Sequence, residues 1–286
     1  MKTVVAGDLA IGDGHPPLIM GVLNLSEESP YTPSIFTDPE RAATYVDESL
    51  IAAGADIVDV GLESANKRFD VLPPERERER LELAFETIDR VNGDAVFSIE
   101  TRYHEVADDA LAGGFEMVND ICGFADPEMA GVCRDHDAAV VKMASPPDLA
   151  RPGAIETVEG LFDALERGGL TDKTIVDPAF GGWSADKTLE MDRETFRRLA
   201  EFRRFDRPIL VSINRKNFLG EIVERETEGR LPASLAATAL IVERGADVIR
   251  THDVAETRDA ALVGHVLGEG RLRSTGERPF PRGRPE

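Results

Sequence analysis

The chain has 286 residues, of which 42% are hydrophobic and 30% charged, a composition that is typical of a globular protein and excludes a fibrous or disordered one. No apolar run approaches the roughly 18 residues of a membrane-spanning helix, and the first residues lack the apolar core of a signal peptide, so we expect a cytoplasmic protein without a membrane partner. With 54 acidic and 33 basic residues the net charge is −21, which argues against a nucleic-acid partner because phosphates would be repelled.

Lysine is rare in this chain, with only six among the 33 basic residues. An acid-rich and lysine-poor composition resembles that of halophile proteins, whose dense carboxylates hold water at high salt. We favour this interpretation over an acidic composition without a physical role.

The predicted elements begin with a short hairpin in residues 1–17, which contain two glycine-rich turns. Five apolar runs predict strands at residues 18–23, 95–99, 138–143, 174–176 and 208–213. Three further strands end repeated segments in which glycine precedes an apolar run, at residues 53–61, 113–120 and 244–252. Amphipathic helices are predicted between the strands, at residues 39–53, 74–91, 105–112, 127–134, 156–167, 185–205, 232–244 and 255–267.

This regular alternation of strands and helices implies an α/β fold with a parallel sheet. Eight repeats favour closure into a single (β/α)8 barrel, the TIM barrel, over an open doubly wound sheet. The predicted organisation is therefore an N-terminal hairpin at residues 1–17, a barrel at residues 18–268 and a flexible C-terminal tail at residues 269–286, which is rich in arginine, glycine and proline.

Polar residues follow almost every predicted strand, at the end of the barrel where reactive groups gather in such folds. In chain order they are Asn24, Glu63-Ser64, Glu100-Thr101, Asn119-Asp120, Lys142, Asp177, Asn214-Arg215-Lys216 and Arg250-Thr251-His252-Asp253. Carboxylates, amides and cations at one mouth must be paired or solvated, so their joint placement predicts a site for a polar heterocycle and an anion.

Individual roles follow from the chemistry of these groups. Asp177 and Asn119 can bond the donors of a purine-like or pterin-like base, and Lys216 can donate to its carbonyl. Arg250 and His252 end the eighth strand, where barrels often bind phosphate.

Each of these residues also has a simpler interpretation when taken alone. Asn24 and Asn214 could cap turns, and His252 could be a core histidine. Asp59 and Asp120 are expected to orient their neighbours without touching a ligand. The placement of the whole set at one mouth is what favours a site.

Seven motifs, in chain order, resemble those of the dihydropteroate synthases. They lie at residues 19–26, 56–64, 98–101, 118–121, 177–178, 215–220 and 250–258, and together span about residues 18–266. The resemblance implies an enzyme that joins 6-hydroxymethyl-7,8-dihydropterin diphosphate to 4-aminobenzoate and releases pyrophosphate, in folate synthesis. With the acidic composition, it indicates a haloarchaeal-type member of this family.

The resemblance also implies site residues. Those for the pterin are Glu100, Asn119, Asp177 and Lys216. Those for the diphosphate are Asn24, Arg250 and His252, of which Asn24 also binds Mg²⁺, the implied cofactor. Lys216, Arg250 and His252 are the implied catalytic residues, and no general base is needed because the aniline nitrogen is already nucleophilic. Residues assigned to the acceptor are Ser64, Asn214 and Arg215, together with Trp183, which stands where the chain departs from the family.

The acceptor side is where the chain departs most from the family. The second loop reads Glu-Ser-Ala-Asn-Lys-Arg at residues 63–68, where Glu-Ser-Thr-Arg-Pro-Gly is usual, and the first loop (residues 26–31) and the segment after Pro178 also differ. Asn214 replaces a serine and Glu100 an aspartate. The acceptor is therefore expected to be 4-aminobenzoate or a related arylamine, with replacement aromatic walls and a replacement cation for its carboxylate. These candidates are Trp183, Tyr31, Lys187 and Lys67.

Two other functions stay open from the sequence. A methyltransferase that uses methyltetrahydrofolate on the same barrel would share the pterin residues but has no use for the diphosphate set. A catalytically silent pterin-binding protein, or a partner subunit of a true synthase, would fit the altered acceptor positions. The family also implies a homodimer that forms through outer helices of the barrel.

Overall fold

The computed structural model describes residues 2–26, 35–63, 71–181 and 187–268. Two residues that were assigned to the acceptor, Ser64 and Trp183, lie outside these ranges, as do Tyr31, Lys67 and the predicted tail at 269–286. Among the described residues, no helix is long and apolar enough to cross a membrane.

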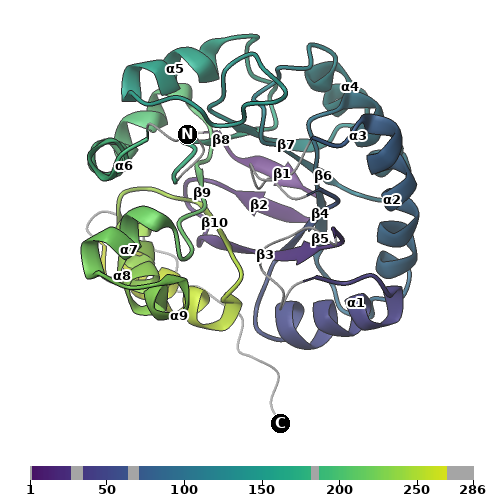
Figure 1. Cartoon of the computed structure of the whole chain (residues 1–286), viewed down its shortest axis with the longest axis horizontal. Coiled ribbons are helices and arrows are strands. Elements are labelled where there is room, and N and C mark those ends of the chain that lie inside the picture. The colour runs from purple at the N-terminus through teal and green to yellow at the C-terminus, as the bar shows by residue number, and fades with distance from the viewer. Residues whose placement is uncertain (1, 27–34, 64–70, 182–186, 269–286) are drawn as a thin grey trace.

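Eight parallel strands form the centre of the molecule, and helices surround them (Figure 1). The strands are β3 (Leu18–Asn24), β4 (Ile57–Gly61), β5 (Val96–Glu100), β6 (Met117–Asp120), β7 (Ala139–Met143), β8 (Thr174–Asp177), β9 (Leu210–Val211) and β10 (Val248–Thr251). Their order in the sheet is β8-β7-β6-β5-β4-β3-β10-β9. The sheet closes between β8 and β9, because Val176 forms a parallel bridge with Ile209 and its N–H donates to the carbonyl of Pro208 at 2.9 Å. The predicted (β/α)8 barrel is confirmed.

The helices follow the strands in turn and cover the outside of the barrel. They are α1 (Pro39–Tyr45), η2 (Val46–Ile51), α2 (Pro74–Ile88), α3 (His104–Ala112), α4 (Met129–Asp135), α5 (Val158–Glu166), α6 (Leu189–Arg197), η3 (Leu199–Phe205), α7 (Asn217–Val223), η4 (Thr227–Arg230), α8 (Leu231–Glu243) and α9 (Val254–Leu267). The strands are buried on both faces, as parallel strands in this architecture are, which explains why they read as continuous apolar runs.

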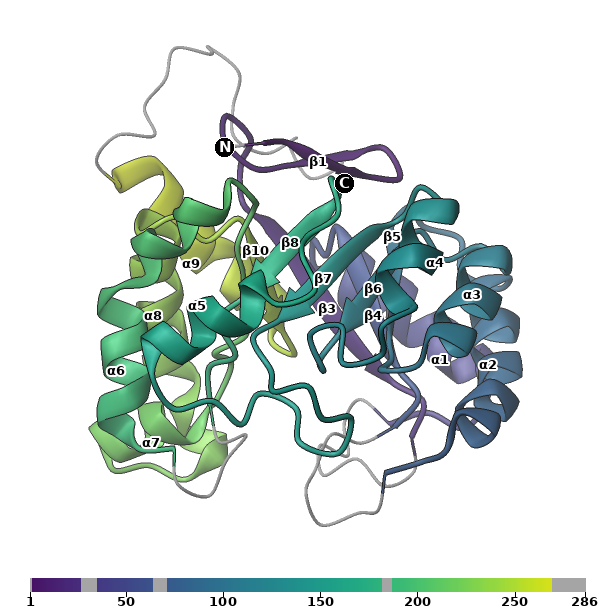
Figure 2. The same cartoon turned by 90° about the horizontal axis from the view of Figure 1, so that it is seen from above.

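The N-terminal hairpin closes one end of the barrel. Strands β1 (Val4–Ala6) and β2 (Leu9–Ile11) pair antiparallel, and Figure 2 shows them lying across the ends of the barrel strands. Side chains of the hairpin, such as Val4 and Ile11, join the apolar cluster inside the barrel together with Met20 and Ile57. This end is therefore filled with apolar side chains. The polar residues that follow the strands lie at the opposite end, where the carboxyl ends of the parallel strands meet, and we call this end the mouth.

Local structure departs from the sequence prediction in several places, of which three concern the helices around the mouth and the outside of the barrel. The helix predicted at 39–53 continues beyond Tyr45 as the π-helix η2, and the helix predicted at 185–205 is divided at Arg198 into α6 and η3. Residues 217–223 form a helix, α7, that the sequence did not predict, because its start at Lys216 carries no side-chain cap.

Candidate active site at the barrel mouth

A buried carboxylate, Asp59, lies at the centre of the polar network inside the mouth. Its side chain is fully buried on β4 and accepts three hydrogen bonds: one from the Ser98 hydroxyl at 2.8 Å, one from the Asn119 amide at 2.9 Å and one from Arg250 Nε at 2.7 Å. These donors come from β5, β6 and β10. Asp59 therefore orients its neighbours, as the sequence led us to expect.

The guanidinium of Arg250 crosses the barrel from β10 and meets a second carboxylate. Its Nη2 donates to Glu100 Oε2 at 2.6 Å, and the Asn119 amide lies 3.5 Å from the same oxygen. Burial raises the pKa of Glu100, and the charge of Arg250 opposes this rise. The structure thus brings three predicted residues, Glu100, Asn119 and Arg250, into direct contact.

Asp177 and Lys216 form the other wall of the mouth. Asp177 ends β8, is 6% exposed and accepts the N–H of Ala179 at 2.7 Å. Burial raises the pKa of Asp177 to about 6 and lowers the pKa of Lys216 to about 8, with the charge of Arg250 adding to the second effect. Both groups therefore titrate close to neutral pH.

The side chain of Lys216 passes close to the backbone of Gly181. A Cβ at Gly181 would lie 2.7 Å from Lys216 Cδ, and this glycine has a φ of +102°. A residue with a side chain would be strained here and would displace the lysine stem, so glycine is required.

Lys187, a proposed replacement cation for the acceptor, lies inside the protein. Its side chain is 1% exposed, forms an ion pair with Asp192 at 3.2 Å and donates to the carbonyl of Ala179 at 2.5 Å. The amine therefore fixes the connection after β8, and its contacts are with the protein itself.

Asn214 and Arg215, which were assigned to the acceptor, both contact Asp253. The Asn214 amide donates to Asp253 Oδ2 at 2.8 Å, and Arg215 binds both carboxylate oxygens, at 2.8 and 2.9 Å. These bonds join the connection after β9 to the start of α9. The sequence did not indicate this role for Asp253, because its partners lie nearly 40 positions away in the chain.

His252 stands beside Arg250 at the end of β10. Burial lowers the pKa of His252 to about 3, and the positive charge of Arg250 contributes. Burial therefore favours the neutral imidazole, in which one ring nitrogen can donate a hydrogen bond.

The predicted metal ligand, Asn24, is half-buried at the end of β3. A Cβ at the neighbouring Gly61 would approach Asn24 Oδ1 to 3.4 Å, so glycine leaves room beside this oxygen. Mg²⁺ prefers six oxygen ligands and usually keeps several waters and substrate phosphates. A single amide oxygen fits Mg²⁺ that is carried largely by the diphosphate.

Lys142 does not belong to the site, contrary to the sequence prediction that grouped it with the other strand ends. Its fully buried amine donates to the carbonyls of Leu165, Arg167 and Gly169, at and beyond the end of α5. The side chain leaves the face of β7 that is turned toward the helices, so it stabilises a helix end and does not reach the mouth.

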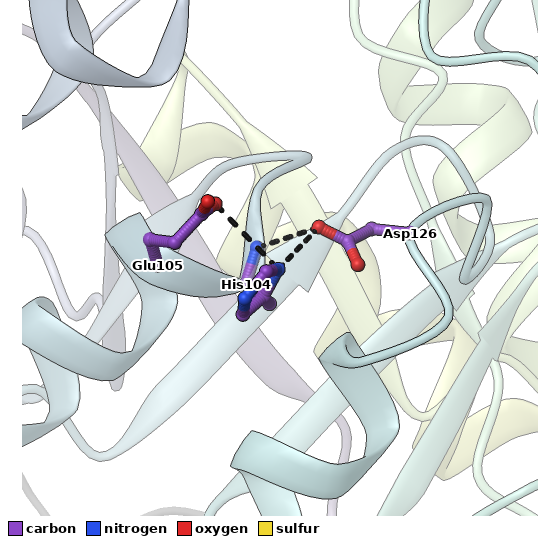
Figure 3. Close-up of side chains that lie close together, drawn as sticks. All are labelled: His104, Glu105 and Asp126. Carbon is purple, nitrogen blue, oxygen red and sulfur yellow. Dashed lines mark hydrogen bonds and ion pairs between the residues drawn. The ribbon is translucent and has the colours of Figure 1, made fainter.

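A second polar cluster joins α3 to the connection after β6 (Figure 3). His104 Nδ1 lies 2.8 Å from Asp126 Oδ2 and 3.5 Å from Glu105 Oε2, and its Nε2 lies 2.7 Å from Glu128 Oε2. Asp126 also accepts the backbone N–H of His104 at 3.0 Å. These contacts explain the cluster as ion pairs that fix the start of α3, since both ring nitrogens already face carboxylates.

Comparison with known proteins agrees with this geometry. A family model described as pterin binding enzyme matches residues 20–252. The dihydropteroate synthase of Neisseria meningitidis serogroup B is 31% identical over 92% of this chain and 96% of its own length. The chain therefore belongs to the pterin-binding enzyme family.

Within that family, the similar proteins are dihydropteroate synthases. The structure of the Thermus thermophilus synthase in complex with 4-aminobenzoate has a TM-score of 0.74 and 30% identity, covering 93% of this chain and 100% of that one. The Coxiella burnetii synthase in complex with pteroic acid has a TM-score of 0.77 and 26% identity, covering 94% and 99%. A probable bifunctional folylpolyglutamate synthase/dihydropteroate synthase of Halobacterium salinarum is 32% identical over 90% of this chain, which spans about a third (32%) of that protein's length.

Proposed function

We propose that this protein is a dihydropteroate synthase that condenses 6-hydroxymethyl-7,8-dihydropterin diphosphate with 4-aminobenzoate or a related arylamine. The observation that carries this proposal is the contact of Glu100, Asn119 and Arg250 around Asp59, opposite Asp177 and Lys216, at the one mouth of the barrel. The same strand ends carry the family motifs, and synthases of similar length are covered almost completely.

The pterin would bind between these two walls. The Asp177 carboxylate would accept from the amino and ring N–H groups of the base, and Asn119 would complete this set of hydrogen bonds. The Lys216 ammonium would donate to the ring carbonyl. Glu100 would border the same pocket, where its carboxylate reaches one methylene further than aspartate does.

The diphosphate would bind next to the pterin, at Arg250 and His252. Cleavage of the C–O bond leaves positive charge on the methylene carbon and negative charge on the departing pyrophosphate. The Arg250 charge and the neutral His252 donor would stabilise this negative charge, which is electrostatic catalysis directed at the charge that develops. Arg250 would have to divide its donors between the diphosphate and its present partners, Asp59 and Glu100.

We propose Mg²⁺ as the cofactor, held by Asn24 together with oxygens of the diphosphate. When bound, the ion would supply positive charge to the leaving group. The support is the chemistry of the donor, an amide oxygen with space beside Gly61. Calorimetry tests this: Mg²⁺ should bind much more weakly to the protein alone than to the protein with the diphosphate, and equal binding would contradict the proposal.

The activity is tested by measuring pyrophosphate release from dihydropterin diphosphate with Mg²⁺ and 4-aminobenzoate, in multimolar KCl. Release that requires the amine supports the synthase. Absence of release while the diphosphate still binds would favour a different amine or a silent pterin-binding protein. Release that does not require an amine would contradict the synthase. Methyl transfer from methyltetrahydrofolate would support the methyltransferase alternative. The placement of Arg250 and His252 favours an anionic leaving group and so the synthase.

We also propose a homodimer that forms through α8 and α9. Four large apolar side chains are 40 to 77% exposed on these two helices, which pack against each other: Leu240, Val263, Val266 and Leu267. Val263→Glu should shift the protein to a monomer in sedimentation experiments, whereas Val5→Glu, at a similarly exposed position on the hairpin, should not. A dimer that survives the first change would contradict this interface.

The cellular setting is part of the same proposal. Both substrates are small, charged and water-soluble, which suits a cytoplasmic enzyme. The net charge of −21 and the similar proteins from Halobacterium salinarum and Haloferax volcanii support adaptation to high salt.

A further inference from the structure

One buried arginine near the mouth has no place in the proposed chemistry. Arg102 follows β5 by two residues and is only 4% exposed. Its Nη2 donates to Glu63 Oε2 at 3.1 Å, and its Nη1 donates to the carbonyl of Leu149. Both of these hydrogen bonds join the buried guanidinium to other parts of the protein.

These partners belong to different connections of the barrel. Glu63 follows β4, Arg102 follows β5 and Leu149 lies between β7 and α5. A single planar guanidinium, which offers several donors in fixed directions, thus joins three of the connections that surround the mouth.

The Arg102 contact extends to Leu72, on the far side of the connection after β4. The second oxygen of Glu63, Oε1, accepts the Leu72 N–H at 3.1 Å, and the Tyr103 hydroxyl donates to the Leu72 carbonyl at 2.7 Å. Arg102 therefore fixes the carboxylate of Glu63, which is bonded to Leu72 across the connection after β4.

A second carboxyl group, that of Glu77, lies close to the Arg102–Glu63 ion pair but does not replace Glu63 as the partner of Arg102. Glu77 on α2 is 1% exposed and accepts the Thr101 hydroxyl at 2.6 Å. Burial raises the pKa of Glu77 well above its usual range and so favours the neutral carboxyl group. Glu63 is then the carboxylate that directly pairs with Arg102.

We infer that Arg102 is a positioning residue for the arylamine acceptor, which acts by holding the connections after β4, β5 and β7 in register at one side of the mouth. This inference rests on the proposed function, because the connection that starts at Glu63 is the one that the family resemblance assigns to the acceptor. Its physical basis is that a misplacement of about 1 Å, caused by a change away from the reacting atoms, can cost about a hundredfold in rate.

The test is Arg102→Lys. Lysine keeps the positive charge, but it lacks the planar guanidinium that bonds Glu63 and Leu149 at the same time. Arg207→Lys is the matched control, because Arg207 is 8% exposed and binds the Thr171 carbonyl with two donors, at 3.1 and 3.0 Å, near the floor of the barrel. Steady-state kinetics should show the KM for 4-aminobenzoate rising about tenfold in Arg102→Lys, with the KM for the dihydropterin diphosphate changing by less than about twofold and no change of either in the control.

A second readout does not depend on activity. Hydrogen exchange of residues 71–76 and 149–153 should become faster in Arg102→Lys and stay unchanged in Arg207→Lys. If Arg102→Lys does not fold, Glu63→Gln removes the same ion pair at constant size and should give the same pattern. Equal rises of both KM values, or unchanged exchange, would overturn the inference. If the wild type turns over no arylamine, the proposed function fails, and the exchange experiment still decides whether Arg102 holds these connections.

Discussion

The role of Asp59 can be tested by removing its charge at constant size. In Asp59→Asn the amide oxygen can still accept from Arg250 or Asn119, but the new amide N–H groups must face Ser98 or a donor. A hydrogen bond to a charged group is worth about 1.5–3 kcal/mol and a neutral one about 0.5–1.5, so each of the three bonds loses about 1 kcal/mol. The expected cost is about 3 kcal/mol, at the lower end of the about 3–5 kcal/mol for breaking a buried ion pair. The lower end is reasonable because Glu100 still pairs with Arg250.

Denaturant unfolding and calorimetry measure this prediction. The unfolding free energy should fall by about 3 kcal/mol, and the affinity for dihydropterin diphosphate should fall about tenfold or more, because Arg250 and Asn119 lose their common anchor. Asp56→Asn is the control. Asp56 directly precedes the same strand, at the end of the barrel that the hairpin closes. Within the described part of the chain, its carboxylate accepts one hydrogen bond, from the Ile19 N–H at 2.8 Å. It should leave pterin binding unchanged. A stability change below about 1 kcal/mol in Asp59→Asn, or equal effects of both variants on binding, would refute the reasoning.

Three further predictions follow from charges and packing. The pH profile of kcat/KM for the dihydropterin diphosphate should be bell-shaped, rising near pH 6 as Asp177 loses its proton and falling near pH 8 as Lys216 becomes neutral. The fall at high pH should disappear in Lys216→Arg. If it persists, a group other than Lys216 causes it. Gly264→Ala should lower the free energy of unfolding by about 1–3 kcal/mol, because the new Cβ would lie 2.3 Å from a backbone carbonyl oxygen of α8. Gly131→Ala, in open space on α4, should leave this free energy unchanged or raise it. Equal effects of the two substitutions on unfolding would contradict this packing. His104→Gln should lower the stability of the protein more at pH 5 than at pH 8. Burial opposes protonation of the imidazole, but the neighbouring carboxylates outweigh this effect and raise the pKa of His104. The stabilisation by His104 is therefore complete below the ordinary pKa of histidine and is lost as the pH rises through the raised value. A loss of stability that does not vary with pH would contradict the ion-pair role.

The sequence by itself determined the architecture and most of the set of residues at the mouth. Eight buried apolar runs that alternate with amphipathic helices leave few ways to cover both faces of a parallel sheet. Because the carboxyl ends of parallel strands share one end of a barrel, Asn119, Asp177 and Arg250 could be placed together before their contacts were known. The sequence did not predict helix α7, because it follows a polar strand end directly and no side-chain cap marks its start.

The tertiary structure alone decided which side chains contact one another. Asp59 and Arg250 lie 191 positions apart, and no local pattern predicts their hydrogen bond. Lys142 and Asn119 both occupy strand ends, but a strand turns successive side chains to opposite faces, so one stabilises a helix and the other lines the mouth. The joining role of Arg102 and the pairing of Arg215 with Asp253 depend equally on connections that meet only when the barrel closes. Sequence spacing fixes the strand to which a residue belongs, and the closed barrel fixes its partner, because partners come from strands that are distant in the chain and adjacent only in space.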